Sequence, residues 1–511
     1  MIRCDLGRDM FKNKLIAQTV FLPQQQHIAE ALFCQGNGYL GLRGCMEESY
    51  TGERRGLFVS GFYGDSEGLF NFADICNLNF LIDGKPIVVT DPRVSSFLRV
   101  LNLGDGELEK SFIYEDNGCK LQFTYSRFVS IKNEHLIATR VKVQVIKGEI
   151  DLGVSSGMTA NKGNKFNTSV SDGDILQLHY NFNNKTKEAV MATSHRFYIN
   201  FDRVRPDSRM EENDSGIYIS TNFNLKEKDS LTVEKLSNVY TSWDLSYREV
   251  KGFNVKHDSL SNIREALGLR YNEHLLISHR LWKNYFANMG LTLKSKYDID
   301  EISASLALYY MRTISHQTDD RQKTGLFGLF SEYGERDFER VSQYLSPYYL
   351  LEKQTQARPK NNIYNKYSDL LKNRQHGAKS AADKCILSYR AGNIEEAQSL
   401  LNKIVRHSFE DEISYNGLEV PDIIGIWSCF VEGIAGISLE KDILNTAPVG
   451  QERISLLQVP VWLNGRQLLV RIEDGKLFII VSGEGTVKIQ VYGEEKELDT
   501  GIHSFNLRDI L

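Results

Sequence analysis

The sequence has little proline and no strong excess of charge of either sign. Nine prolines in 511 residues exclude a collagen-like or proline-rich extended chain. Lys and Arg together number 61 and Asp and Glu number 66, so the formal net charge of −5 creates no cationic field for a polyanion. We therefore expect no nucleic-acid partner.

Long hydrophobic runs are also missing. The longest, residues 423–439, is interrupted by Glu432 and is shorter than the roughly 20 residues that a membrane span requires. This run predicts a buried helix. The first 25 residues contain no apolar core of the kind that a secretory signal has. We expect no membrane association.

Paired cysteines are a third absence. The seven cysteines are an odd, scattered set without a CxxC pair, which argues against a disulfide framework and a structural zinc site. The sequence also lacks a Walker lysine motif, an HExxH motif and a GxSxG motif. These absences predict a protein of the reducing cytoplasm, with no metal and no cofactor.

The length and the hydrophobic patterning indicate several domains. A chain of 511 residues exceeds one ordinary core, and 41% hydrophobic residues can fill more than one. Short alternating runs, such as 121–131, 135–146 and 195–204, lie between Gly, Asn and Asp clusters. Many such strands without intervening helices predict a large antiparallel β-sandwich over residues 1–255.

The periodicity changes after this segment. Apolar residues at helical spacing over 261–289 predict a long linking helix within a helical linker at 256–295. Helical patterning continues and predicts a helical domain at 296–440. Alternating strands with Asn-Gly and Asp-Gly pairs then predict a small C-terminal β-sandwich at 441–511. The expected fold class is multidomain β plus α.

Three motifs carry a resemblance to a known family. They are NGYLGLRGCMEE (37–48), GLFVSGFYGD (56–65) and NLNFLIDGKPI (77–87). They resemble the N-terminal β-domain of glycoside hydrolase family sixty-five, which contains maltose, trehalose and kojibiose phosphorylases and related α-glucosidases. The segments RLWKNYF (280–286) and GIWSCFVEGIAGI (425–437) look like later landmarks of that family. The resemblance implies a sugar or sugar-like ligand and an active site in a twelve-helix (α/α) barrel.

The first departure from the family is length. The predicted helical domain has 145 positions from 296 to 440, which hold six or seven helices at roughly 20–25 residues per helix and connection. We therefore expect a truncated barrel that lacks the region carrying the family's general-acid glutamate. Losing half a barrel would uncover apolar helix faces, so a homo-oligomer or a protein partner is expected.

The second departure lies in the family's sugar pocket. Anchoring on Pro347 places Arg336 where the family has histidine and Arg340 where it has aspartate. A guanidinium cannot accept a hydrogen bond from a sugar hydroxyl, so this subsite is rewritten. The candidate substrate-binding residues are Arg336, Arg340, Tyr348 and Trp427. The alternative interpretation is an ion-paired helix surface, because Arg336 and Glu339 are three residues apart.

The third departure concerns phosphate. The phosphorylases carry a Gly-[Ile/Leu]-His step that helps to bind phosphate, whereas this chain has Gly417-Leu418-Glu419. A carboxylate repels phosphate, so phosphorolysis is disfavoured. The same step resembles the hydrolytic branch of the family, which implies that Glu419 is a candidate general base. The alternative interpretation is that Glu419 is a solvent-exposed loop residue without a catalytic role.

Candidate general acids come from the same acidic cluster as the rewritten subsite. They are Glu335, Asp337 and Glu339. The predicted function is a carbohydrate-active protein in which phosphorolysis is lost and hydrolysis-like acid/base chemistry uses Glu419. Two alternatives stay open: a non-catalytic scaffold or partner-binding pseudoenzyme, and unrelated chemistry on a larger substrate.

Two further patterns carry weaker signals. Gly36, Gly38 and Gly41 spell GxGxxG, but no strand-turn-helix unit surrounds them, so tight turns are expected in place of a dinucleotide site. Glu47 and Glu48 are adjacent, and adjacent residues on a strand face opposite ways. An acid/base dyad is therefore not expected there.

Overall fold

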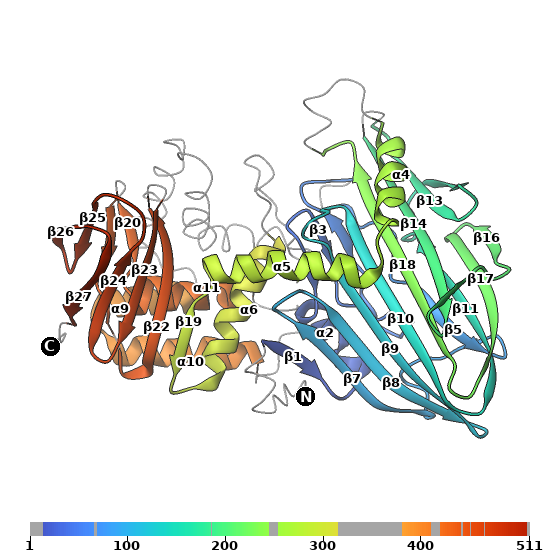
Figure 1. Cartoon of the computed structure of the whole chain (residues 1–511), viewed down its shortest axis with the longest axis horizontal. Coiled ribbons are helices and arrows are strands. Elements are labelled where there is room, and N and C mark those ends of the chain that lie inside the picture. The colour runs from blue at the N-terminus through green and yellow to red at the C-terminus, as the bar shows by residue number, and fades with distance from the viewer. Residues whose placement is uncertain are drawn as a thin grey trace. The chain divides into compact units, whose positions relative to one another are not determined.

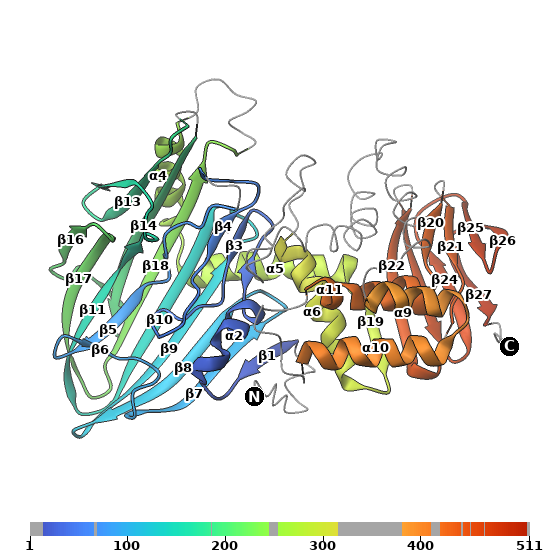
Figure 2. The ribbon, with the colours of Figure 1, turned by 180° about the vertical axis from the view of Figure 1, so that it is seen from behind.

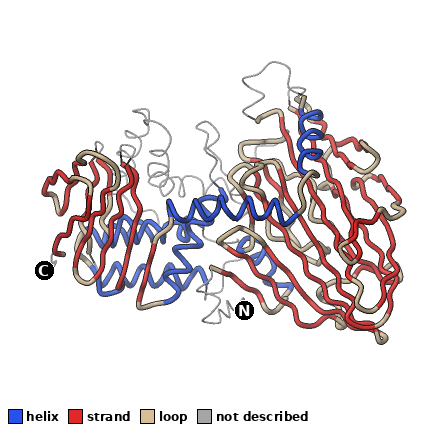
Figure 3. Tube along the Cα trace, in the orientation of Figure 1, coloured by secondary structure: helices blue, strands red, loops and turns tan. Residues whose placement is uncertain are grey.

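The protein is represented by a computed structural model, which describes residues 14–65, 69–184, 187–244, 254–314, 381–409, 420–440, 443–449, 451–463 and 466–507. The chain divides into two units (Figure 1). Unit 1 comprises Met1–Trp282 with Arg312–Gly334, and unit 2 comprises Lys283–Met311 with Glu335–Leu511. Figure 3 shows strands dominating unit 1, whereas helices and strands share unit 2.

Unit 1 contains two large antiparallel sheets and one small sheet. The first has the order β1-β7-β8-β9-β10-β18-β14-β13-β12, with β15 also paired to β14. Its strands are β1 (Leu15–Gln18), β7 (Val94–Asn102), β8 (Leu108–Asp116), β9 (Cys119–Val129), β10 (Leu136–Lys147), β12 (Phe166–Ser171), β13 (Ile175–Asn181), β14 (Glu188–Ile199), β15 (Asp202–Val204) and β18 (Ser230–Thr241).

The second sheet has the order β16-β17-β11-β5-β6, and the small sheet has the order β2-β3-β4. These strands are β2 (Gln35–Gly36), β3 (Leu40–Leu42), β4 (Leu57–Val59), β5 (Leu78–Ile82), β6 (Lys85–Pro86), β11 (Glu149–Thr159), β16 (Arg209–Asn213) and β17 (Gly216–Lys226). A short 3-10 turn, η1 (Pro23–Gln25), and helix α2 (Gln26–Leu32) precede β2, and Figure 2 shows α2 from behind.

The core of unit 1 lies between the sheets. Alternate residues of each strand point inward, as the period-two pattern predicts. Phe80 from β5 meets Phe123 from β9 at a ring-centroid distance of 5.4 Å, and Phe112 from β8 stacks on Phe123 at 4.9 Å. All three side chains are at most 1% exposed. The predicted antiparallel sandwich is confirmed.

The run 195–204 is not the single strand that its alternation predicted. It forms the end of β14, a two-residue turn at Asn200 and Phe201, and the short return strand β15. Both turn residues have left-handed backbones, with φ of 51° and 78°. The sequence gives no warning of this turn, because its second position carries Phe in place of the usual Gly.

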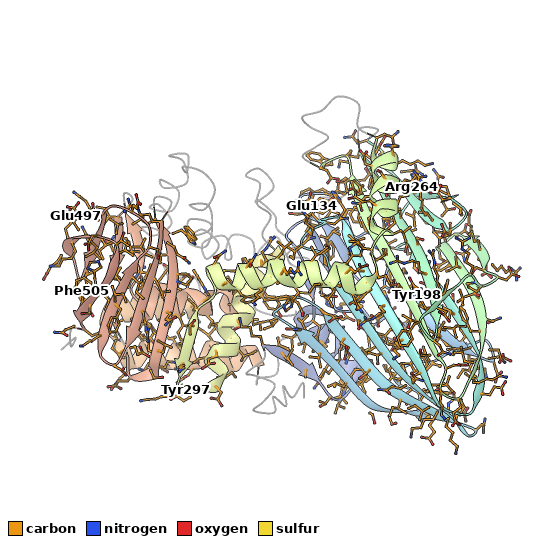
Figure 4. All side chains as sticks on the ribbon, in the orientation of Figure 1. Glu134, Tyr198, Arg264, Tyr297, Glu497 and Phe505 are labelled. Atoms are coloured by element: carbon orange, nitrogen blue, oxygen red, sulfur yellow. The ribbon has the colours of Figure 1, made fainter. Side chains whose placement is uncertain are left out.

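The segment 261–289 forms two helices in place of the one long helix expected. Helix α4 (Val255–Ala266) ends before Gly268, and α5 (Tyr271–Met289) begins after it. The carboxylate of Glu273 accepts a hydrogen bond of 2.8 Å from the backbone N–H of Arg270, which caps the start of α5. The guanidinium of Arg270 lies 4.0 Å from the ring centroid of Tyr198 on β14, labelled in Figure 4, and anchors the break to the sheet.

The glycines of the GxGxxG pattern serve a hairpin. Gly38 has a φ of 90° in the turn between β2 and β3. A Cβ on Gly36 would lie 2.8 Å from the backbone oxygen of Leu40 and 2.7 Å from a side-chain carbon of Thr313. A turn explains Gly38, as the sequence predicted, whereas Gly36 lies in β2 and is explained by close packing in place of the predicted turn.

Glu47 and Glu48 do not lie in the strand that the sequence led us to expect. Glu47 and Glu48 lie in a bend and not in a strand, so the rule of opposite faces does not apply to them. Both carboxylates contact the ammonium group of Lys110, and the Glu47 contact measures 2.7 Å. Arg127 donates a further bond of 3.1 Å to Glu47. All four side chains are at most 6% exposed, so the motif makes a buried charge cluster.

Unit 2 combines helices with two further sheets. The sheets have the orders β19-β22-β23-β24-β27 and β20-β21-β25-β26. Among the described strands of these sheets, only β21 and β25 pair in parallel. The strands are β19 (Thr292–Ser295), β20 (Ser438–Glu440), β21 (Ile443–Thr446), β22 (Ile454–Leu463), β23 (Arg466–Glu473), β24 (Lys476–Val481), β25 (Val487–Val491), β26 (Glu494–Leu498) and β27 (Gly501–Asn506).

The described helices of unit 2 from α6 to η3 lie within residues 296–440, where helical patterning is expected. The helical elements described in unit 2 are α6 (Asp298–Ile314), α9 (Ala381–Arg390), α10 (Ile394–Phe409), α11 (Val420–Ser428), the π-helix η3 (Cys429–Ile434) and the 3-10 turn η4 (Gln451–Arg453). The apolar run at 423–439 is buried from Ile423 to Ala435, as predicted, but it turns into strand β20 at its end. The truncated barrel stays a prediction.

Candidate functional site

Most of the predicted site residues lie outside the described part of the chain. They are Glu335, Arg336, Asp337, Glu339, Arg340, Tyr348 and Glu419. Trp427 is described and lies on α11, whose first residue, Val420, directly follows Glu419 in the sequence. The structure therefore describes α11 and its neighbours, whereas Glu419 lies outside the described residues.

Helix α11 is buried from Ile423 onward. Ile423, Ile424, Ile426 and Trp427 are each at most 1% exposed. Apolar side chains on several faces of a helix place it in a protein interior. Trp427 also brings a polar group, its indole Nε1, into that interior. This Nε1 has no hydrogen-bond acceptor among the described residues.

The chain leaves α11 through a π-helix. In η3 the backbone N–H of Ala435 donates to the carbonyl of Phe430 at 2.9 Å, which is the wider i to i+5 spacing. Such wide turns are rare in proteins, and many of those that do occur lie at functional sites. Here the wide turn carries Glu432, whose side chain is 1% exposed. Its carboxylate receives a hydrogen bond of 3.3 Å from the guanidinium of Arg390 at the end of α9.

Helix α9 adds more polar groups to the same interior. Asp383 and Tyr389 are at most 1% exposed. A Cβ on Gly433 would lie 2.9 Å from the ring of Tyr389, so the absence of a side chain on η3 lets this ring pack closely. Burial, followed by the neighbouring thiol of Cys385, raises the pKa of Tyr389, and the phenol therefore stays protonated.

A second network braces these helices. The guanidinium of Arg453 donates two hydrogen bonds to Asp300 on α6, at 2.6 and 2.7 Å, and one of 2.7 Å to Asn402 on α10. Arg453 and Asp300 have side chains at most 2% exposed. A bidentate, buried pair fixes both orientation and distance. It ties α6 and α10 to the start of strand β22 within unit 2.

The α9–η3 cluster, defined as Asp383, Tyr389, Arg390, Trp427 and Glu432, can supply both donors and acceptors. Carboxylates accept hydrogen bonds from hydroxyls, whereas guanidinium, phenol and indole groups donate them. The buried Tyr389 hydroxyl and Trp427 Nε1 have no hydrogen-bond partner among the described residues.

Sequence reasoning found only part of this cluster. Trp427 was a candidate, and Glu432 stood out only as an interruption of an apolar run. Arg390 and Tyr389 were missed as functional candidates. A lone acid in a long apolar run is the signal that could have found Glu432, because a buried carboxylate needs a partner.

Two negative findings concern only the described residues. They contain no group of three or more His, Cys, Asp or Glu side chains that could hold a metal ion. None of their helices is long and apolar enough to cross a membrane. The six cysteines of the described residues, Cys34, Cys45, Cys76, Cys119, Cys385 and Cys429, are all buried.

Comparisons with known proteins place this architecture. The kojibiose phosphorylase of Halothermothrix orenii is 26% identical over 368 residues, covering 68% of this chain and 46% of that protein. The maltose phosphorylase of Bacillus subtilis is 20% identical over 405 residues, covering 71% of this chain and 50% of that protein. The chain therefore spans about half the length of the curated relatives it matches.

A solved structure described as a putative kojibiose phosphorylase from the human microbiome shares the fold. It has a TM-score of 0.74 at 11% identity and covers 96% of this chain and 98% of that chain. The model of the glycosyl hydrolase family 65 N-terminal domain matches residues 16–285, which is more than half of the sequence. That match includes the three motifs and the confirmed sandwich, and the chain belongs to glycosyl hydrolase family 65.

Proposed function

We propose that the chain is a carbohydrate-active protein that binds an α-linked glucoside and hydrolyses it, with Glu419 as the general base. Its similarity to proteins named kojibiose and maltose phosphorylase supports a glucoside ligand. The observation that carries the proposal is Glu419 itself, which stands at the step where phosphorylases of this family carry histidine. A carboxylate there repels phosphate and can activate water.

The helix that begins at the next residue supports this proposal. It is α11, which is buried from Ile423 onward and continues into the Glu432–Arg390 pair. A base must be held within a fraction of an ångström of its working position, and a buried helix provides that support. Trp427 and Tyr389 add aromatic surface and donors to the same interior.

The reaction also needs a general acid. Inverting hydrolysis uses two carboxyl groups about 6.5–9.5 Å apart, one to protonate the leaving oxygen and one to activate water. We assign the acid to the cluster of Glu335, Asp337 and Glu339, with Arg336, Arg340 and Tyr348 as ligands of the sugar. The proposed compartment is the reducing cytoplasm, which suits a sequence whose seven scattered cysteines include no CxxC pair.

The test is turnover of kojibiose, maltose and trehalose with and without inorganic phosphate. We expect glucose release that does not depend on phosphate and no glucose 1-phosphate. Glu419→Gln should lower kcat by roughly 10²–10⁴, because it removes the base. The matched control is Glu395→Gln, an exposed acid in the first turn of α10, which should retain full activity. Glucose 1-phosphate formation, or full activity of Glu419→Gln, would refute the proposal.

A second candidate function is a non-catalytic scaffold. The predicted helical domain has room for only about half of a barrel, which favours an apolar face that a second copy or another protein covers. Size-exclusion chromatography with light scattering measures this directly. A homo-oligomer without turnover of any of the three disaccharides supports the scaffold, whereas an active monomer excludes it.

A further inference from the structure

A groove of about 960 Å³ opens on unit 1 beside the β14–β15 hairpin. Its walls come from the link between β15 and β16, from β16 and from the middle of β17. Strand β16 is the edge of its sheet, and Figures 1 and 2 show it on the rim of the unit. This volume is near the upper end of the range for small-molecule sites, so the groove can hold a ligand larger than a simple ion.

The floor of the groove is apolar and rigid. It is lined by Ile199, Val204 and Phe223. Phe223 is 5% exposed, and its ring centroid lies 5.5 Å from that of Phe197 in the core. Ile199 and Val204 pack against the same core cluster. The floor is therefore preformed, which lowers the entropy that a ligand loses on binding.

The walls carry donors and acceptors in equal measure. Arg205 and Arg209 donate, whereas Asp207 and Glu211 accept. The two closest opposite charges, Arg209 Nε and Glu211 Oε1, are 3.9 Å apart with side chains 84% and 51% exposed, so both groups can reach a ligand. The charges cancel, which suits a neutral ligand with many hydroxyl groups better than an anion or a cation.

A hydrogen bond from β17 holds the part of the wall that links β15 to β16. The hydroxyl of Thr221 on β17 donates a hydrogen bond of 3.0 Å to the backbone oxygen of Asp207. This bond holds the link between β15 and β16 against the sheet and leaves the exposed Asp207 side chain free to turn toward the groove.

The tip of the hairpin carries an aromatic ring that the fold does not use. Phe201 is 81% exposed, although its backbone has a φ of 78°. A bulky residue in this region is strained, and Gly is the usual choice at this position of a two-residue hairpin. Asn200 tolerates the turn because its side chain bonds to Asp229 and Ser230. Phe201 does not line the groove itself, but it follows the lining residue Ile199 by two positions, and its exposed ring is accessible to an external ligand.

We propose that this groove is a binding site for a neutral gluco-oligosaccharide. Its hydroxyls bond to the arginine and carboxylate walls, its ring carbons contact the apolar floor, and Phe201 stacks on one sugar at the groove mouth. This site goes beyond the proposed hydrolysis, because every residue that lines it belongs to the β-sandwich of unit 1.

Isothermal titration calorimetry of the intact chain tests the site with maltopentaose, isomaltopentaose, cellopentaose and inorganic phosphate as probes. Each titration is repeated in Glu419→Gln, so that heat of hydrolysis is removed and a failure of the proposed reaction is seen separately. We expect saturable binding of at least one pentasaccharide and none of phosphate. Arg209→Ala should weaken that binding about tenfold, because it removes a charged donor.

The matched control is Met210→Ala. Met210 lies between two groove residues on β16 and is 39% exposed, but it does not line the groove. The affinity of the Met210→Ala variant for the pentasaccharide should be unchanged. Phe201→Gly should weaken binding about tenfold while raising the melting temperature, a pair of effects that a purely structural role would not give. Absence of pentasaccharide binding below about 10 mM, binding unaffected by both groove variants, or binding of phosphate alone would overturn the proposal.

Discussion

Replacing Lys110 by Met tests whether charge holds the bend that carries the family motif. The ammonium of Lys110 lies 2.7 Å from Glu47 and also contacts Glu48, and the three side chains are 3%, 6% and 2% exposed. Removing one partner of a buried pair leaves an uncompensated charge, which costs roughly 3–5 kcal/mol. We expect Lys110→Met to lower the free energy of unfolding of unit 1 by about 4 kcal/mol at pH 7.

The pH dependence gives this prediction its sharpest form. Burial alone raises the pKa of Glu47, but the charges of Lys110 and Arg127 outweigh it and lower the pKa to about 2. The unfolded carboxyl titrates near pH 4.3. The stabilisation is therefore present above about pH 4.3 and is lost as the pH falls toward 2. In Lys110→Met the pKa of Glu47 rises, so the difference between the two proteins shrinks over the same range.

The assay is urea unfolding followed by circular dichroism at pH 7, 5 and 3.5. Hydrogen exchange at pH 7 assigns the change to peptides of β8 and β9. The control is Lys120→Met, because Lys120 pairs with Glu115 at 2.9 Å with side chains 35% and 62% exposed. An exposed pair contributes less than about 1 kcal/mol. An equal loss in the control, or a deficit in Lys110→Met that does not vary with pH, would refute the reasoning.

Four further substitutions test other parts of the structure. Gly436→Ala should lower the stability of unit 2 by about 3 kcal/mol by calorimetry, because a Cβ there would lie 2.3 Å from a carbonyl oxygen at a φ of 59°. Gly475→Ala, with a φ of 72° and open space, should lower it by only about 1 kcal/mol, and equal losses would contradict this account. Arg453→Met should destabilise unit 2 by roughly 3–5 kcal/mol in urea, because it strands the buried carboxylate of Asp300; a loss below 1 kcal/mol would argue against it. Burial, followed by the charge of Lys235, lowers the pKa of His195 well below 6.5. The unfolded imidazole takes up a proton below about pH 6.5 while the folded one stays neutral, so stability is lost as the pH falls. His195→Gln should therefore reduce the fall of the melting temperature between about pH 6.5 and 4.

The strands of the sandwich could be predicted closely from the sequence. The run 121–131 became β9 at Cys119–Val129, and 135–146 became β10 at Leu136–Lys147. Strands that are buried on one face show their period directly in the sequence. The prediction of a single strand over 195–204 was wrong because the turn within it uses Phe201, and no ordinary turn signal marks that position.

The candidate site could be predicted only in part. Glu432 was visible as an acid in an apolar run, but its partner Arg390 lies 42 positions earlier in the chain. Nothing in a single sequence states which of its many cations meets a given carboxylate. The predicted base and acid candidates remain predictions, since they lie outside the described residues.

The sequence by itself determined the family, the sandwich and the nature of the residue at position 419, because these depend on local period and on motifs that are contiguous in the chain. Only the tertiary structure decided that Glu47 and Glu48 share one lysine, that Arg390 neutralises Glu432, and that a groove forms beside β16. These features depend on contacts between segments far apart in sequence, where burial and not spacing selects the partner.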